Sequence, residues 1–238
     1  MATTPISTPT IDLRRPDAAI LPRWAMPAFA ALFVLALFLD IPIAGWVHSA
    51  GLSAWLKGDL PHRWTLVVRF PGRFYFTIAA CVVLIALAFR RHDPRPFDDA
   101  ALVFLAGVLS GVNTILKWAV GRTRPFHDVG SIHNVPAFHL IPFRGGWDGL
   151  FFAEQNLSFP SGDASLAFAM SAALTMVAPR WQAIWWIMGI IVGIERVLEG
   201  AHYPSDVVGG AILGILVAKL AQRILRRPPP QANISQSV

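Results

Sequence analysis

Six long apolar segments restrict what this chain can fold into. Hydrophobic residues make up 55% of the 238 residues, and charged residues only 14%. A helix needs about 20 apolar residues to cross a bilayer, where its backbone polar groups must bond within the segment. We therefore predict an all-α fold, a polytopic membrane helical bundle with six transmembrane helices near residues 24–47, 74–89, 100–120, 162–178, 182–198 and 206–220.

The two ends of the chain have a different composition. Both are rich in Thr, Pro, Ser or Gln and carry no long apolar run, which is typical of disordered tails. We predict a disordered cytoplasmic tail at residues 1–22, a membrane domain at 23–226 and a second disordered tail at 227–238. Cys81 is the single cysteine, so an intramolecular disulfide bond is excluded.

Clusters of arginine at the ends of the predicted helices indicate the orientation. With six spans the clusters fall on one side, which the positive-inside rule makes cytoplasmic. Both termini are then cytoplasmic, and the loops before Gly162 and after Leu198 face outward. The net charge is +6, but this distribution argues against a nucleic-acid partner. The clusters are Arg14, Arg15 and Arg23; Arg90, Arg91 and Arg95; Arg180; and Arg223, Arg226 and Arg227.

Two basic residues lie near the end of the third apolar segment. Lys117 lies inside the segment, where a charge is costly and points to function unless the side chain snorkels to the headgroups. Arg124 comes seven residues later, before Pro125, in a predicted loop. We expect Arg122, beside it, to be a solvated charge or a headgroup contact. These residues alone leave both interpretations of Lys117 open.

A short turn begins the fourth predicted helix. Pro160 ends an extended segment, Ser161 is suited to the N-cap position, and Gly162 lets a ligand approach the backbone. The free N–H groups and the helix dipole favour an anion there. Ordinary helix capping is the alternative, and Asp163 fits it as well, because a carboxylate is favourable in a first turn.

His202 and Asp206 lie four residues apart at the start of the sixth predicted helix. If Asp206 accepts a proton from one imidazole nitrogen, the other nitrogen is left as a nucleophile or base. The alternative is that Asp206 caps the helix and His202 is a bystander. Arg196, at the end of the fifth predicted helix, is a second costly cation in an apolar segment.

Together the three strings resemble the signature of the type 2 phosphatidic acid phosphatase superfamily, which includes bacterial acid phosphatases and vanadium haloperoxidases. That signature is K-x6-RP, then PSGH, then SR-x5-H-x3-D. The resemblance covers about residues 100–220, and six helices are typical of its membrane branch. The matching residues are Lys117 with Arg124-Pro125, then Pro160-Ser161-Gly162, then Arg196, His202 and Asp206.

The resemblance implies a membrane phosphatase that forms a phosphohistidine intermediate and needs neither a metal ion nor another cofactor. His202 attacks phosphorus and Asp206 orients His202. Cations around the phosphate neutralise its oxygens, as electrostatic catalysis of phosphoryl transfer requires. The residues implied to bind the phosphate are Lys117, Arg124, Ser161, Gly162 and Arg196.

The same resemblance implies a lipid phosphate as the substrate. Undecaprenyl diphosphate, phosphatidylglycerophosphate, phosphatidic acid and lipid A phosphate are the candidates, processed on the outer side of a bacterial inner membrane. A phosphotransferase that uses a lipid hydroxyl in place of water is one alternative. A catalytically impaired lipid-binding protein is another. No feature of the sequence indicates the oligomeric state.

Two positions depart from the signature. Position 163 is Asp where the resemblance implies a His that protonates the leaving group, and position 195 is Glu where it implies Ser. A model Asp titrates near ~3.9. Asp163 is therefore an acid with a raised pKa, a base for the hydrolytic water, or a helix cap, and the sequence does not decide among the three. It indicates no role for Glu195.

Two loops complete the prediction. Residues 126–159 carry His127, His133 and His139, whose irregular spacing lacks the paired ligands of common zinc sites. We expect no metal site in this loop. We expect the loop to form a lid that selects substrates. The first outer loop, residues 48–73, mixes aromatic with basic residues, which is typical of an interfacial amphipathic helix that guides a lipid phosphate to the site.

Overall fold

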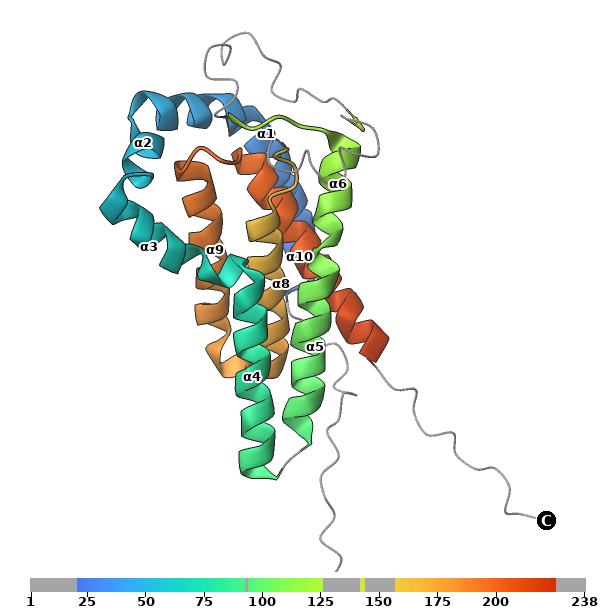
Figure 1. Ribbon diagram of the computed structural model, residues 1–238. Coiled ribbons are helices and arrows are strands. Elements are labelled where there is room, and N and C mark those ends of the chain that lie inside the picture. Colours follow the sequence, from blue (N-terminus) through green and yellow to red (C-terminus); the bar gives the residue numbers. More distant parts are fainter. Residues whose placement is uncertain (1–20, 93, 126–141, 144–156, 226–238) are drawn as a thin grey trace, which may run out of the picture.

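The computed structural model describes residues 21–92, 94–125, 142–143 and 157–225. Both predicted tails and most of the predicted lid lie outside these residues. The described elements are helices (Figure 1), apart from one antiparallel bridge between Thr123 and Leu157. In chain order they are α1 (Ala25–Ser49), α2 (Leu52–Leu56), α3 (Asp59–Arg69), the 3-10 helix η1 (Phe70–Gly72), α4 (Phe74–Arg91), α5 (Arg95–Ser110), α6 (Val112–Val120), α8 (Gly162–Val177), the 3-10 helix η4 (Pro179–Trp181), α9 (Gln182–Leu198) and α10 (Pro204–Leu225).

The apolar segments predicted from the sequence are helices, so the all-α membrane fold is confirmed. Within the part of the chain that the structure describes, five stretches are long and apolar enough to cross a membrane: Ala25–Ser49, Phe74–Arg91, Arg95–Val120, Pro179–Leu198 and Pro204–Leu225. The remaining one, α8, has only 16 residues. It is about 24 Å long at 1.5 Å per residue, shorter than a hydrocarbon core of about 30 Å. The predicted count of six full spans therefore does not follow from the described helices.

The third apolar segment consists of two helices. α5 begins at Arg95, earlier than predicted, with Pro96 in its first turn. Proline is tolerated there because the first N–H groups of a helix have no partner within the helix. α5 ends at Ser110, and α6 begins after Gly111 and carries Lys117 in its last turn.

α8 forms the centre of the bundle and packs against α5, α9 and α10. It meets α10 closely through Gly210 and Gly214. A Cβ on Gly210 would lie 2.5 Å from the carbonyl oxygen of Ser161, and one on Gly214 would lie 2.2 Å from that of Ser165. Small residues four apart allow membrane helices this approach. The contact sets Asp206 beside the start of α8, where the Ser161 N–H donates to the Asp206 carbonyl at 3.0 Å.

The first outer loop folds into α2, α3 and η1, and η1 packs on α8 and α9. A Cβ on Gly72 would lie 2.7 Å from the carbonyl oxygen of Asp163, so η1 rests directly on the first turn of α8. Trp55 and Trp64 are largely exposed, as expected for side chains at a membrane interface. Arg69, at the end of α3, is instead buried.

Candidate active site

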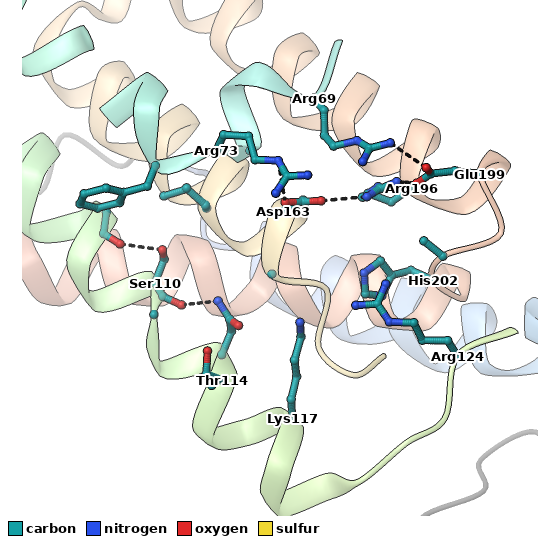
Figure 2. Close-up of a pocket in the computed structure, with 18 of the residues that line it drawn as sticks. Arg69, Arg73, Ser110, Thr114, Lys117, Arg124, Asp163, Arg196, Glu199 and His202 are labelled. Atoms are coloured by element: carbon teal, nitrogen blue, oxygen red, sulfur yellow. Dashed lines mark hydrogen bonds and ion pairs between the residues drawn. The ribbon is translucent and has the colours of Figure 1, made fainter. Parts of the chain in front are cut away.

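A cavity of about 800 Å³ lies where α8 begins. Its walls come from η1, α5, α6, the first turn of α8, the end of α9 and the connection from α9 to α10 (Figure 2). Basic side chains dominate the charged part of its lining, which favours an anionic ligand. The charged lining residues are Lys57, Arg69, Arg73, Lys117, Arg124 and Arg196, with Asp163 and Glu199.

Most of the predicted site residues meet in this cavity. Lys117, Arg124, Gly162, Arg196 and His202 all line it, although they come from separate parts of the chain. Figure 2 shows Lys117 and Arg124 directed toward His202. Lys117 is only 4% exposed. Its ammonium group therefore points into the protein and does not snorkel to the headgroups.

The turn at the start of α8 has the predicted cap. The Ser161 hydroxyl accepts a hydrogen bond from the Ala164 N–H at 3.4 Å, and Ser161 is fully buried. Gly162 lines the cavity, whereas Ser161 is not among the described lining residues. A Cβ on Gly162 would lie 3.2 Å from Oδ1 of Asn113. The backbone of Gly162 is thus the part of this turn that a ligand in the cavity can reach.

His202 lies between α9 and α10 with one ring nitrogen toward Asp206. Nδ1 of His202 is 3.7 Å from Oδ2 of Asp206, longer than a hydrogen bond. Burial lowers the pKa of His202 to about 4; Asp206 opposes this shift, and Arg124 and Lys117 add to it. The imidazole is therefore neutral near pH 7, the form that has a free ring-nitrogen lone pair.

Arg122 pairs with Asp206, and the prediction that Arg122 is a solvated charge or a headgroup contact is wrong. Arg122 is 1% exposed, and it is neither solvated nor at the headgroups. Its Nη1 donates to Oδ1 of Asp206 at 2.6 Å, and its Nη2 donates to Oδ2 of Asp40 at 2.8 Å. The Tyr203 ring stacks on the guanidinium, 4.0 Å from the ring centroid. Nothing local in the sequence separates Arg122 from an ordinary loop arginine.

Asp40, the second partner of Arg122, was also missed. It is fully buried in α1 and accepts hydrogen bonds from the backbone N–H of Ser205 at 2.9 Å and from its hydroxyl at 2.5 Å. The sequence does contain a signal for Asp40, because an aspartate inside an apolar span is by default a functional candidate.

The two departures from the signature lie next to Arg196. Asp163 accepts a hydrogen bond from Nη1 of Arg196 at 2.9 Å. Glu195 accepts one from Nε of Arg196 at 3.0 Å and pairs with Arg69 at 2.8 Å. Glu199 contacts both Arg196 and Arg69. Glu195 is therefore a buried bridge between two arginines, and Arg196 is held from three sides by carboxylates.

Metal ligands are the remaining question at this site. Among the described residues no group of three His, Cys, Asp or Glu side chains is arranged to hold a metal ion. His127, His133 and His139 lie outside these residues. The expectation of a site that works without a metal therefore stays a prediction.

A cationic cavity around a buried neutral histidine, in a bundle of apolar helices, defines a helical integral-membrane protein with an oxyanion site. The chain belongs to the PAP2 superfamily, whose pattern matches residues 99–228. This match confirms the resemblance found in the three strings. It begins in α5, so α1 and its Asp40 lie outside it.

Two curated relatives show the range of named activities. A lipid A 1-phosphatase from Rhizobium johnstonii is 34% identical over 128 residues, which are 53% of this chain and 48% of that protein. An undecaprenyl-diphosphatase from Sulfolobus acidocaldarius is 29% identical over 157 residues, 64% of this chain and 65% of that protein. The chain thus spans about half the length of the first relative and two thirds of the second.

Two solved structures share the fold. Aquifex aeolicus LpxE superposes with a TM-score of 0.51 at 22% identity, covering 78% of this chain and 95% of that one. A transmembrane PAP2 type phosphatidylglycerolphosphate phosphatase from Bacillus subtilis also has a TM-score of 0.51, at 21% identity, covering 82% and 94%. At these identities the likeness concerns the fold.

Proposed function

We propose that this protein is a membrane lipid phosphatase that works through a phosphohistidine intermediate. The observation that carries the proposal is the meeting of His202, Lys117, Arg124, Arg196 and the Gly162 backbone in one cavity. Each group suits phosphoryl transfer: a neutral imidazole to attack, and preorganised cations and N–H groups to stabilise the charge on the phosphate oxygens.

The orientation of His202 assigns its two nitrogens. Because Nδ1 faces Asp206, Nε2 is the nitrogen that attacks phosphorus. A bond forms between Nε2 and phosphorus, the bond to the leaving oxygen breaks, and that oxygen departs with the electron pair. The imidazole then carries a positive charge and keeps its proton on Nδ1, which Asp206 stabilises. Water next attacks phosphorus and releases inorganic phosphate and neutral His202.

The lipid class of the substrate is supported by the surroundings of the cavity. Phe74 and Val108 line it, and both are also exposed on helices long enough to span a membrane. A headgroup bound at the cations thus lies beside a surface that faces acyl chains. The named activities of the relatives, on lipid A and on undecaprenyl diphosphate, support a phosphorylated or diphosphorylated lipid as the substrate.

We propose that the cavity faces away from the cytoplasm. Gly162 and Asp163 in the first turn of α8 line it, and α8 begins at the end of the bundle opposite the α4–α5 and α8–α9 connections (Figure 1). α4 ends in Arg90 and Arg91, and η4 carries Arg180. By the positive-inside rule, connections that carry such cations lie in the cytoplasm.

Phosphate release from a lipid panel in detergent tests the function. The panel holds phosphatidic acid, phosphatidylglycerophosphate, lipid A phosphate and undecaprenyl diphosphate. Release from at least one lipid that persists in EDTA, is inhibited by vanadate and is lost in His202→Ala supports the proposal. EDTA inhibition that zinc or magnesium reverses contradicts the metal-independent mechanism.

Two other outcomes separate the alternatives. Label transfer to an acceptor lipid without free phosphate identifies a phosphotransferase. Binding of the panel lipids without release by the wild type identifies a lipid-binding protein. The carboxylates that surround Arg196 make this second outcome worth measuring, because they compete with a phosphate for its guanidinium.

A further inference from the structure

Asp40 reaches the candidate site from a helix outside the matched family segment. It lies within α1, and its carboxylate is fully buried. A buried charge in an apolar span is costly unless partners compensate it. Its partners are Arg122 at 2.8 Å and the hydroxyl and backbone N–H of Ser205. Ser205 directly precedes Asp206, so the contacts of Asp40 end beside the carboxylate that faces His202.

The two carboxylate oxygens of Asp206 have different partners. Oδ1 accepts the hydrogen bond from Arg122 at 2.6 Å. Oδ2 accepts one from the Tyr203 backbone N–H at 2.8 Å and faces Nδ1 of His202. The carboxylate is therefore fixed on both sides, and its free rotation is lost before any substrate arrives.

The charges of this cluster do not cancel. Arg122 forms ion pairs with both Asp40 and Asp206, and with both carboxylates ionised the three side chains together carry one net negative charge. Without Asp40, Arg122 and Asp206 would be neutral as a pair, and little negative charge would act on His202. Burial makes this difference matter, because charge interactions are weakly screened away from water.

We propose that Asp40 is a positioning residue that balances Arg122, so that Asp206 keeps its negative charge toward His202 during phosphorylation. This rests on the proposed function of His202 as the nucleophile. The positive charge on the phosphorylated imidazole is the charge that the cluster stabilises. The other charged groups that act on His202 are Lys117, Arg124 and Asp163, and they are present in every variant below.

Three variants change the cluster charge stepwise. Asp40→Asn keeps the size and leaves the cluster neutral. Arg122→Gln gives it two negative charges. The double variant Asp40→Asn/Arg122→Gln restores one negative charge, as in the wild type. Asp98→Asn, in the first turn of α5 and away from the cavity lining, is the matched control.

The first readout is steady-state kinetics on the panel lipid with the highest turnover. We expect Asp40→Asn to lower kcat about tenfold, the effect of one pKa unit of lost stabilisation, with KM nearly unchanged. We expect the double variant to recover part of this loss and Asp98→Asn to match the wild type. A fall in kcat for Asp40→Asn that the double variant deepens would overturn the proposal, because charge balance would then not be the cause.

The second readout does not need turnover. His202 in the full-length protein is titrated by NMR with isotope-labelled histidine, and its signal is identified by its loss in His202→Gln. The expected order of the His202 pKa is Arg122→Gln highest, wild type and double variant equal, and Asp40→Asn lowest. An unchanged His202 pKa in folded Asp40→Asn and in folded Arg122→Gln contradicts the inference, even if the wild type releases phosphate. The expected order in a protein that releases no phosphate would leave the charge balance standing and refute only the phosphatase function.

Discussion

Asp163 and Arg196 form an ion pair at the wall of the cavity, with Nη1 and Oδ2 2.9 Å apart. Arg73 lies on the other side of the same carboxylate, its Nε 3.8 Å from Oδ1. Two guanidinium groups favour the ionised form of a carboxylate between them. Of the three roles that the sequence left open for Asp163, this geometry disfavours the acid with a raised pKa, because the ionised carboxylate pairs with both arginines.

Asp163→His is expected to change substrate preference. A lipid monophosphate leaving from a diphosphate needs little protonation, whereas an alcohol leaving from a monoester needs an acid. We expect the variant to raise kcat/KM for a monophosphate lipid at neutral pH more than for the matched diphosphate lipid. The measurement is kcat/KM for both lipids from about pH 5 to 8, a range that lies above the usual pKa of Asp and includes that of His. Equal changes for both lipids at every pH would show that residue 163 does not affect protonation of the leaving group.

Arg73→Gln is expected to affect diphosphate lipids more than monophosphate lipids. Arg73 is about half exposed and lines the cavity beside Asp163, where it can meet a second phosphoryl group. We expect kcat/KM for the diphosphate to fall about tenfold, one charged contact, and that for the monophosphate to fall less. Arg63→Gln, an exposed arginine of α3 outside the cavity lining, controls for charge near the membrane. Equal losses in both variants would show a general surface effect.

The depressed pKa of His202 predicts the acid limb of the pH profile. With a pKa of about 4, His202 stays neutral from pH 8 down to about pH 5. Protonation below that pH removes the lone pair that attacks phosphorus, so kcat/KM is expected to fall only as pH drops through about 4. The ionisation of the lipid phosphate is measured separately by phosphorus NMR and subtracted. A limb centred near 6.5, the usual pKa of a histidine, would contradict a buried neutral His202.

Gly214→Val tests the contact that places Asp206 beside the start of α8. Its Cβ would overlap the Ser165 carbonyl of α8, and overpacking of this kind costs about 1–3 kcal/mol. We expect a lower Tm in detergent and a lower kcat, because Gly162 and Asp206 move apart. Gly45→Ala in α1 meets nothing within 4 Å and is expected to leave both unchanged. Equal Tm values for the two variants would show that the α8–α10 contact is not close-packed.

The orientation is testable by labelling. Phe143 is 55% exposed and packs on Trp118 at the end of α6 that leads toward Arg124. In a Cys81→Ser background, Phe143→Cys is expected to react with an impermeant thiol reagent in intact cells. The same background without the new cysteine is the control. Labelling only after lysis would place the cavity on the cytoplasmic side.

The sequence alone was sufficient to predict the apolar helices and the family. Hydropathy is a local property, since a run of about 20 apolar residues has few other stable structures, and the bounds of α9 were predicted to the residue. The motifs are local as well. Lys117 and Arg124 lie within one short stretch of sequence, and Arg196, His202 and Asp206 lie within another. Together with the turn at Gly162 and Asp163, these spacings were sufficient for the family and for six residues that line the cavity.

The tertiary structure decided how the charges are paired. Arg122 and Asp40 are 82 residues apart, and Arg69 and Glu195 are 126 apart. No periodicity links positions so distant, so Arg122 was taken for a surface charge and Asp163 kept three possible roles. Pairing depends on which elements pack together, such as α1 on α10 and α3 on α9. The protonation of His202 depends on the same burial, because the sequence gives the type of an ionisable group but only its surroundings set its pKa.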